Sequence, residues 1–168
     1  MDLPIFKFGK LYGGPPYLVN KIDPDIVISL AMHLIVRSKN TRQTYHYPIR
    51  NLHVEPLYNI ANALDKIVYH IKRNDKVFVH CLGGCGRTGT VISAYLILYH
   101  GYNYKDAVNE FLRQRGCTIE SYVQEHFLST INYLLSSSTP VSKILAIIRK
   151  SITLNEFMSK AKKYIRLT

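Results

Sequence analysis

The stretch HCLGGCGRTG, residues 80–89, decides how this chain folds and what chemistry it can carry. It is preceded by the apolar run KVFV, which together with His80 predicts a short buried strand. It is followed by a mostly apolar segment, Thr88–His100, which Gly101 ends as expected for a helix. A strand, a glycine-rich loop and a helix in this order leave unpaired backbone N–H groups at the helix start. The stretch is therefore predicted to bind an anion.

The residue types inside this loop suit an attack on a phosphate group. Gly83, Gly84 and Gly86 permit tight turns that point successive N–H groups inward. Arg87 follows Cys81 by six positions, and its planar guanidinium can grip two phosphate oxygens. The same donors stabilise the thiolate form of Cys81, which is the form that attacks phosphorus.

Length and composition fit a single globular domain with a positive surface. The chain has 168 residues, and 22 Lys and Arg against 11 Asp and Glu give a net charge of +11. Such a surface attracts phosphorylated groups, nucleic acid or acidic lipid headgroups. Three cysteines give no secreted disulfide framework, so we expect a reducing, cytoplasmic setting. The first ten residues lack the apolar core of a signal peptide, and no apolar run is long enough to span a bilayer.

Strands alternate with helices before residue 80, and helices dominate after the loop. This order predicts an α/β fold with a small, mostly parallel central sheet flanked by helices. Strands are predicted within residues 5–17, where one strand ends in a Gly-Pro turn, and at Asp25–Ala31, Thr44–Ile49 and 76–80. Helices are predicted at Pro56–Arg73, Thr88–His100 and Tyr104–Arg115, and from a cap at Thr118 to about residue 135.

The last part of the chain is predicted to be helical and basic. SSSTP, residues 136–140, has the composition of a linker, and TLNE, residues 153–156, has the pattern of a capping box at a helix start. We expect residues 136–168 to form helices that pack on a domain made of residues 1–135. The alternative is a basic arm that engages a partner, nucleic acid or an anionic membrane.

The arrangement His-Cys-x5-Arg-Thr-Gly resembles the signature of cysteine-based protein tyrosine and dual-specificity phosphatases. VHCLGGCGRTGTVISAYLIL, residues 79–98, looks especially like the small archaeal members. KLYGGPPY, VISL and SYVQEHFL extend the resemblance over roughly residues 8–135. It implies the fold of this superfamily with extra C-terminal helices. It also implies phosphorylated proteins as substrates and no cofactor or metal, while the basic surface leaves nucleic acid open as a partner.

The resemblance also implies roles for the residues of the loop. Cys81 would form a cysteinyl-phosphate intermediate, Thr88 would donate to its sulfur and help it leave, and His80 would orient the loop. The residues expected to bind phosphate are Leu82, Gly83, Gly84, Cys85, Gly86 and Arg87. Cys85 either packs as a small residue or forms a reversible disulfide with Cys81, and Cys117 is expected to be structural. Gln124 either positions water or lies on a helix surface.

One position departs from the pattern of these phosphatases. In YPIRNLHVEP, residues 47–56, Asn51 occupies the usual place of the general-acid Asp. An amide cannot protonate the leaving oxygen, and loss of a general acid lowers the rate by on the order of 10²–10⁴ for poor leaving groups. Three explanations stay open: His53 or Glu55 supplies the proton, the substrate has a good leaving group, or the protein binds phosphate with weak turnover.

These observations predict cysteine-dependent hydrolysis of phosphotyrosine, and of phosphoserine and phosphothreonine if the pocket is shallow. An RNA or nucleotide 5′-triphosphatase is the alternative, motivated by the net charge of +11 and by Asn51. A weakly active phosphate-binding interaction protein is the third reading.

Overall fold

A five-stranded sheet forms one layer of the molecule. The computed structural model describes residues 4–168. Of the first ten residues, for which no signal peptide is predicted, residues 1–3 lie outside the described part. The strand order is β1-β2-β5-β3-β4, and only β1 is antiparallel to its neighbour. The strands are β1 Phe6–Phe8, β2 Leu11–Gly14, β3 Ile26–Ser29, β4 Gln43–His46 and β5 Val77–His80. The prediction of a mostly parallel central sheet is confirmed.

The amino-terminal segment differs from the single strand that the sequence predicts. Residues 5–17 contain two strands, because the chain reverses after β1 at Gly9, whose φ of +57° suits glycine. β2 then pairs in parallel with β5, so this hairpin extends the sheet at one edge. A short 3₁₀ turn at Pro16–Leu18 leads into α1, Val19–Ile22, a helix that the sequence did not predict.

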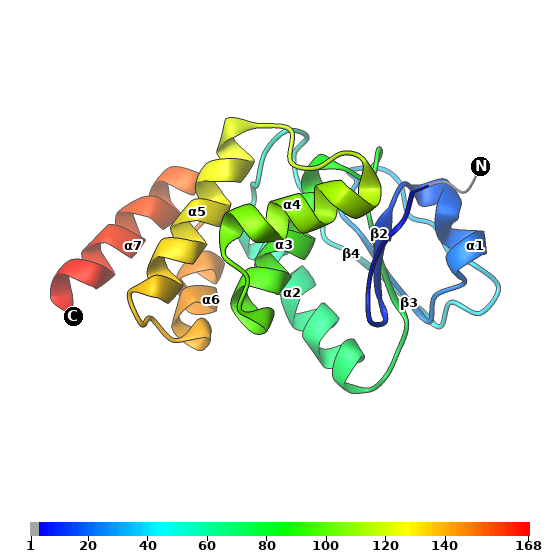
Figure 1. Cartoon of the computed structure of the whole chain (residues 1–168), viewed down its shortest axis with the longest axis horizontal. Helices are drawn as coiled ribbons and strands as arrows, with labels where there is room; N and C mark the ends of the chain where they lie inside the picture. Colours follow the sequence, from blue (N-terminus) through cyan, green and yellow to red (C-terminus); the bar gives the residue numbers. More distant parts are fainter. Residues whose placement is uncertain (1–3) are drawn as a thin grey trace.

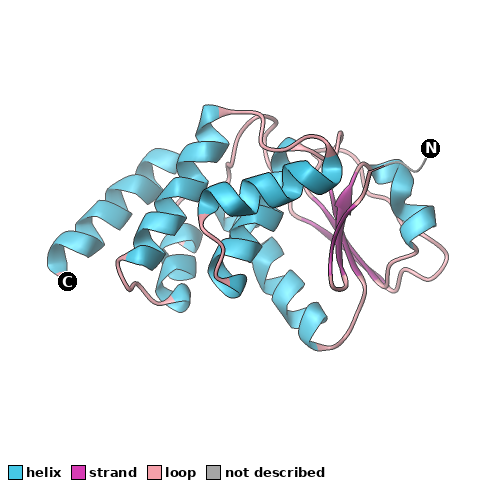
Figure 2. Cartoon of the chain, viewed as in Figure 1, coloured by secondary structure: helices cyan, strands magenta, loops and turns pink. Residues whose placement is uncertain are grey.

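Helices lie on both sides of the sheet (Figure 1). On one side, Leu18 of the 3₁₀ turn and Val19 and Ile22 of α1 pack against Val27 and Phe78 of the sheet. The other side carries the larger helical layer, which Figure 2 shows to make up most of the molecule. Its helices are α2 Leu57–Lys72, α3 Gly86–His100, α4 Tyr104–Arg115 and α5 Tyr122–Ser136. All residues of α3 from 86 to 98 are buried, as expected for a helix enclosed by others.

Two helix starts differ from their predicted positions. α3 begins at Gly86, two residues before the predicted start at Thr88. Gly86 therefore belongs both to the glycine-rich loop and to the helix. The cap of α5 is Ser121 and not Thr118. Ser121 has an extended backbone and accepts a hydrogen bond from the Gln124 N–H, whereas the Thr118 hydroxyl donates to the Val108 carbonyl.

Two further helices, α6 Val141–Arg149 and α7 Leu154–Leu167, follow a short turn after α5. Their apolar side chains, among them Ile144, Ile148 and Phe157, belong to the same buried cluster as those of α2, α3 and α5. Arg149 of α6 forms an ion pair with Asp65 of α2. Figure 1 shows α6 and α7 at the end of the molecule far from the sheet. Thr153 caps α7, as the capping-box pattern predicts.

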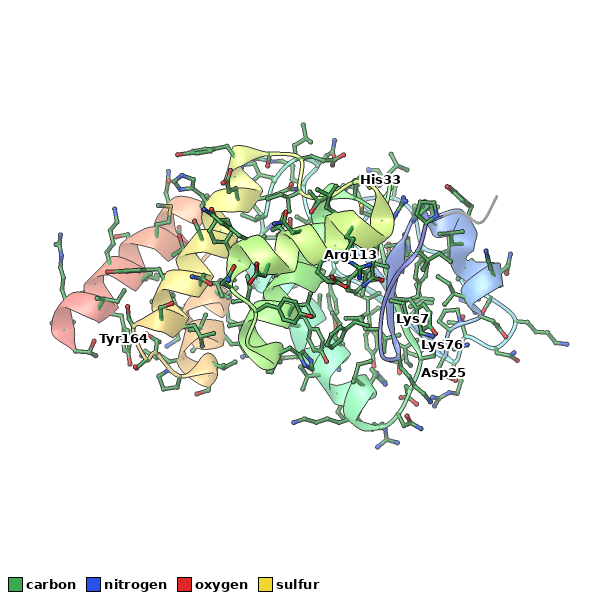
Figure 3. All side chains as sticks on the ribbon, in the orientation of Figure 1. Lys7, Asp25, His33, Lys76, Arg113 and Tyr164 are labelled. Atoms are coloured by element: carbon green, nitrogen blue, oxygen red, sulfur yellow. A yellow bond between two sulfur atoms is a disulfide. The ribbon has the colours of Figure 1, made fainter. Side chains whose placement is uncertain are left out.

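The carboxyl ends of the parallel strands define the place of the site. Asp25 and Lys76 lie at the other end of the sheet, where β3 and β5 begin, and Figure 3 shows them together. There the Lys76 N–H donates to the Asp25 carboxylate at 2.8 Å. β3 and β5 run from there to Ser29 and His80, which are paired in register. No helix within residues 4–168 is long and apolar enough to cross a membrane.

Candidate active site

Residues 80–87 form a loop, called the phosphate loop below, that runs from the end of β5 into α3. Cys81 lies at its base with 3% of its surface exposed and is a free cysteine. Gly84 has a φ of +70° and lies against the backbone of β2, where an added Cβ would be 2.1 Å from the Gly14 carbonyl carbon. Only glycine fits there, so β2 and the loop are packed backbone to backbone.

Two contacts from the end of α4 hold the outer side of the phosphate loop. Arg115 Nη2 donates to the Gly83 carbonyl at 3.0 Å, which keeps that oxygen turned outward. Cys85 forms a disulfide with Cys117, with a Cα–Cα distance of 5.6 Å. The 116–121 segment, which links α4 to α5, is therefore bonded covalently to the loop.

The disulfide corrects both expectations for Cys85. Cys85 is neither an unbonded packing residue nor the partner of Cys81. The physical reason is tertiary: α4 ends beside the phosphate loop, and this brings Cys117 next to Cys85 across a sequence separation of 32. Spacing along the sequence does not reveal this proximity.

Arg87 is positioned by carbonyl groups of two other segments. Its guanidinium is buried, and Nη1 donates to the Ile49 carbonyl at 3.0 Å and to the Leu30 carbonyl at 3.4 Å. Within residues 4–168 these are its only hydrogen bonds, so Nε and Nη2 are left to bind phosphate oxygens. Arg87 and the amino end of α3 together make the loop a site for an anion. Among the described residues, no group of three or more His, Cys, Asp or Glu could hold a metal ion.

His80 and Thr88, at the start and just after the end of the phosphate loop, are both buried. His80 Nδ1 donates to the Cys81 carbonyl at 3.0 Å, which fixes the backbone at the start of the loop. Burial lowers the pKa of His80, so the imidazole is neutral at pH 7. The Thr88 hydroxyl is buried and has no hydrogen-bond partner among residues 4–168. The bond to the Cys81 sulfur that the resemblance implies is therefore not formed in this structure.

The segment with the missing acid, residues 47–56, lies next to Arg87 and forms a closed turn. The Arg50 N–H donates to the Glu55 carbonyl at 2.9 Å, and the His53 N–H donates to the Arg50 carbonyl at 3.1 Å. Asn51 and Leu52 lie exposed at the tip of this turn. The Arg87 contact with the Ile49 carbonyl joins the turn to the phosphate loop.

Of the two acid candidates of this segment, Glu55 lies next to His53 and also contacts α7. Glu55 Oε1 accepts from the Leu154 N–H at the start of α7 at 3.1 Å. Glu55 Oε2 lies 3.4 Å from Arg50 Nη2 and 3.5 Å from His53 Nδ1. Both carboxylate oxygens thus have partners in the fold.

Gln124 connects three parts of the site. It is fully buried, so it does not lie on a helix surface. Its Oε1 accepts from the Glu120 N–H at 2.8 Å, and its Nε2 donates to the His53 carbonyl at 3.4 Å. Nε2 also lies 3.2 Å from where a Cβ would stand on Gly86 of the phosphate loop.

Glu120 is a residue of the site that the sequence reasoning missed. Its carboxylate lies so close to Gly86 that an added Cβ would be 2.3 Å from Oε2. The only signal in the sequence was an acid just before the SYVQEHFL segment. That signal has meaning only once the 116–121 segment is known to meet the phosphate loop.

The model of the dual specificity phosphatase catalytic domain matches residues 16–134, well over half of the chain. This protein belongs to the dual-specificity phosphatase family. The match includes the phosphate loop, the 47–56 segment and the 116–121 segment, and it ends within α5. The helices α6 and α7 thus lie beyond the part that the family defines, although the first residue of α7, Leu154, contacts Glu55.

Known relatives and structures agree with this assignment. An uncharacterized protein of Methanocaldococcus jannaschii is 33% identical over 93 residues, 54% of this chain and 55% of that protein. Human RNA/RNP complex-1-interacting phosphatase is 34% identical over 91 residues, 52% of this chain and 28% of that protein. The matched regions thus span about half of the first relative and less of the second.

Among solved structures, Tk-PTP in its active form is 25% identical, with a TM-score of 0.67 over 79% of this chain and 99% of that one. DUSP15 has a TM-score of 0.71 over 84% of this chain and 94% of that one, at 15% identity. The likeness to DUSP15 shows the fold alone. The α/β fold predicted from the sequence is that of the dual-specificity phosphatases.

Proposed function

We propose that this protein hydrolyses phosphotyrosine in proteins through a cysteinyl-phosphate on Cys81. The carrying observation is the free Cys81 at the base of a loop that Arg87 closes, with the amino end of α3 at the same place. In the first step the Cys81 sulfur bonds to phosphorus while the bond from phosphorus to the tyrosine oxygen breaks. In the second step a water oxygen bonds to phosphorus and the sulfur leaves as thiolate.

The surroundings of the loop favour an aromatic leaving group. Leu82 in the phosphate loop is 66% exposed, and Leu52 at the tip of the 47–56 segment is 48% exposed. Apolar side chains at these two places offer a surface for the ring of phosphotyrosine. Phosphoserine and phosphothreonine, which lack a ring, would gain less from them.

The test is release of phosphate from phosphotyrosine and phosphoserine peptides by wild type and Cys81→Ser. We expect the variant to lose turnover by on the order of 10⁴-fold or more, because a hydroxyl is a far poorer nucleophile than a thiolate. Thermal unfolding serves as the control that the variant is folded. Unchanged turnover by Cys81→Ser would contradict the proposal.

A 5′-triphosphatase acting on RNA is the second candidate. Two observations favour it: the net charge of +11, and a human relative whose name states interaction with an RNA/RNP complex. The leaving group would then be a diphosphate, which departs without a strong acid and suits Asn51. Hydrolysis of triphosphate-ended RNA in the same assay, without hydrolysis of either peptide, would select this candidate. Tight binding of phosphopeptides with no turnover would instead select a phosphate-binding interaction protein.

A further inference from the structure

Glu120 brings a carboxylate to the edge of the phosphate loop. A Cβ added at Gly86 would lie 2.3 Å from Glu120 Oε2 and 3.1 Å from Glu120 Cδ. Gly86 directly precedes Arg87 and is the first residue of α3, so the carboxylate lies beside the amino end of that helix. The absence of a side chain at position 86 leaves the room that this carboxylate occupies.

The segment that carries Glu120 is held at two points. The Glu120 N–H donates to the buried Gln124 side chain at 2.8 Å, and Gln124 also contacts the His53 carbonyl. On the other side of Glu120, the Cys85–Cys117 disulfide bonds the segment to the phosphate loop. These contacts hold the Glu120 backbone in place relative to Cys81. They do not involve the oxygens of the Glu120 carboxylate.

The carboxylate itself has no partner within residues 4–168. It forms no ion pair and no hydrogen bond there, and the residue is exposed. In Glu55, by contrast, Oε1 accepts from the Leu154 N–H and Oε2 pairs with Arg50. Of these two acids near the phosphate loop, Glu120 alone is open to exchange a proton with substrate and water.

We propose that Glu120 is the general acid and general base of this phosphatase, in place of the Asp that Asn51 replaces. The inference rests on the proposed cysteine chemistry of Cys81. A general acid gives its proton to the leaving oxygen as the bond to phosphorus breaks, and an unpaired carboxyl group beside the loop can take this role. Gln124 acts as a positioning residue, because it holds the Glu120 backbone and the 47–56 segment at once.

The proton balance of the two steps is complete with this one group. As sulfur bonds to phosphorus and the bond to the leaving oxygen breaks, the Glu120 carboxyl proton passes to that oxygen. In the second step the Glu120 carboxylate takes a proton from the attacking water as the sulfur–phosphorus bond breaks. The enzyme returns to a thiolate at Cys81 and a carboxylic acid at Glu120, and inorganic phosphate is released.

The experiment compares wild type, Glu120→Gln and Glu120→Asp on aryl phosphates whose phenols range from acidic to weakly acidic, and on an alkyl phosphate. Glu125→Gln is the matched control, since Glu125 is an exposed acid on the first turn of α5. We expect Glu120→Gln to lower turnover of the weakly acidic phenols and the alkyl phosphate by on the order of 10²-fold or more, with far less effect on acidic phenols. The fall of kcat at high pH should disappear in Glu120→Gln and persist in Glu120→Asp and Glu125→Gln.

The outcomes separate this inference from the proposed function. If Glu120→Gln keeps the wild-type dependence on the leaving group and the wild-type pH profile while Cys81→Ser is inactive, the inference is wrong and the cysteine chemistry stands. If Cys81→Ser retains full turnover, both are wrong. A loss in Glu120→Gln that is equal for all leaving groups also overturns the inference, because a proton donor acts most on poor leaving groups.

Discussion

The phosphate loop and the 47–56 segment lie side by side at the site but are held in different ways. The loop is shaped by its own residues: glycines where the backbone turns, Cys81 at the strand end and Arg87 at the helix start. The 47–56 segment is held by distant parts of the chain, through Arg87, Gln124 and Leu154. A local motif thus builds the loop at Cys81 and Arg87, whereas tertiary contacts hold the segment in which Asn51 takes the place of the usual acid.

The largest effect is expected from breaking the loop at Gly84. In Gly84→Ala the Cβ would lie 2.1 Å from the Gly14 carbonyl carbon, at a φ of +70°, so the loop must move. We expect turnover to fall by on the order of 10²-fold or more, because a shift of about 1 Å is enough for such a loss. Gly83→Ala, whose Cβ meets nothing within 4 Å, should lose far less. Equal losses in steady-state turnover for the two variants would contradict the packing of the loop on β2.

The second prediction concerns the anchor of the 47–56 segment on α7. Glu55→Ala leaves the Leu154 N–H without its acceptor, so we expect the free energy of unfolding to fall by about 1–3 kcal/mol. Arg50→Ala removes only an ion pair with an exposed arginine and should change it by about 1 kcal/mol or less. Urea denaturation measures both.

The Glu55→Ala variant also tests which residue donates the proton. If Glu55 only supports the segment, Glu55→Ala keeps the fall of kcat at high pH that depends on Glu120. Loss of that fall in a folded Glu55→Ala protein would move the proton-donor role to Glu55.

The smallest effect is expected from His80, which supports the loop from below. Burial lowers the pKa of His80 from 6.5, so the unfolded chain takes up a proton that the folded protein does not. The free energy of unfolding therefore decreases as the pH is lowered below about 6.5. This group contributes at most about 1.4 kcal/mol per pH unit to that decrease. Denaturation of wild type and His80→Gln from pH 5 to 8 should show a shallower slope in the variant. An unchanged slope would assign the pH dependence to other groups.

Much of the fold follows from patterns that are local in the sequence. Helical spacing predicted α2 and α4 close to their observed bounds, the capping box predicted the start of α7, and the apolar runs predicted β3 and β5. The hairpin of β1 and β2 was missed because its turn at Gly9 lies inside one apolar segment. The start of α5 was misplaced because Thr118 and Ser121 are both suitable caps, and only backbone conformation distinguishes them.

The sequence by itself determined the strand–loop–helix and the places of Cys81 and Arg87 in it, because these lie within a few consecutive residues. It also located Asn51, where the usual acid is missing. The tertiary structure alone decided what surrounds them: the Cys85–Cys117 disulfide, the contact of Glu55 with α7, and Glu120 beside Gly86. Each of these joins segments far apart in the chain, and the packing of α4, α5 and α7 on the sheet and on one another brings them together.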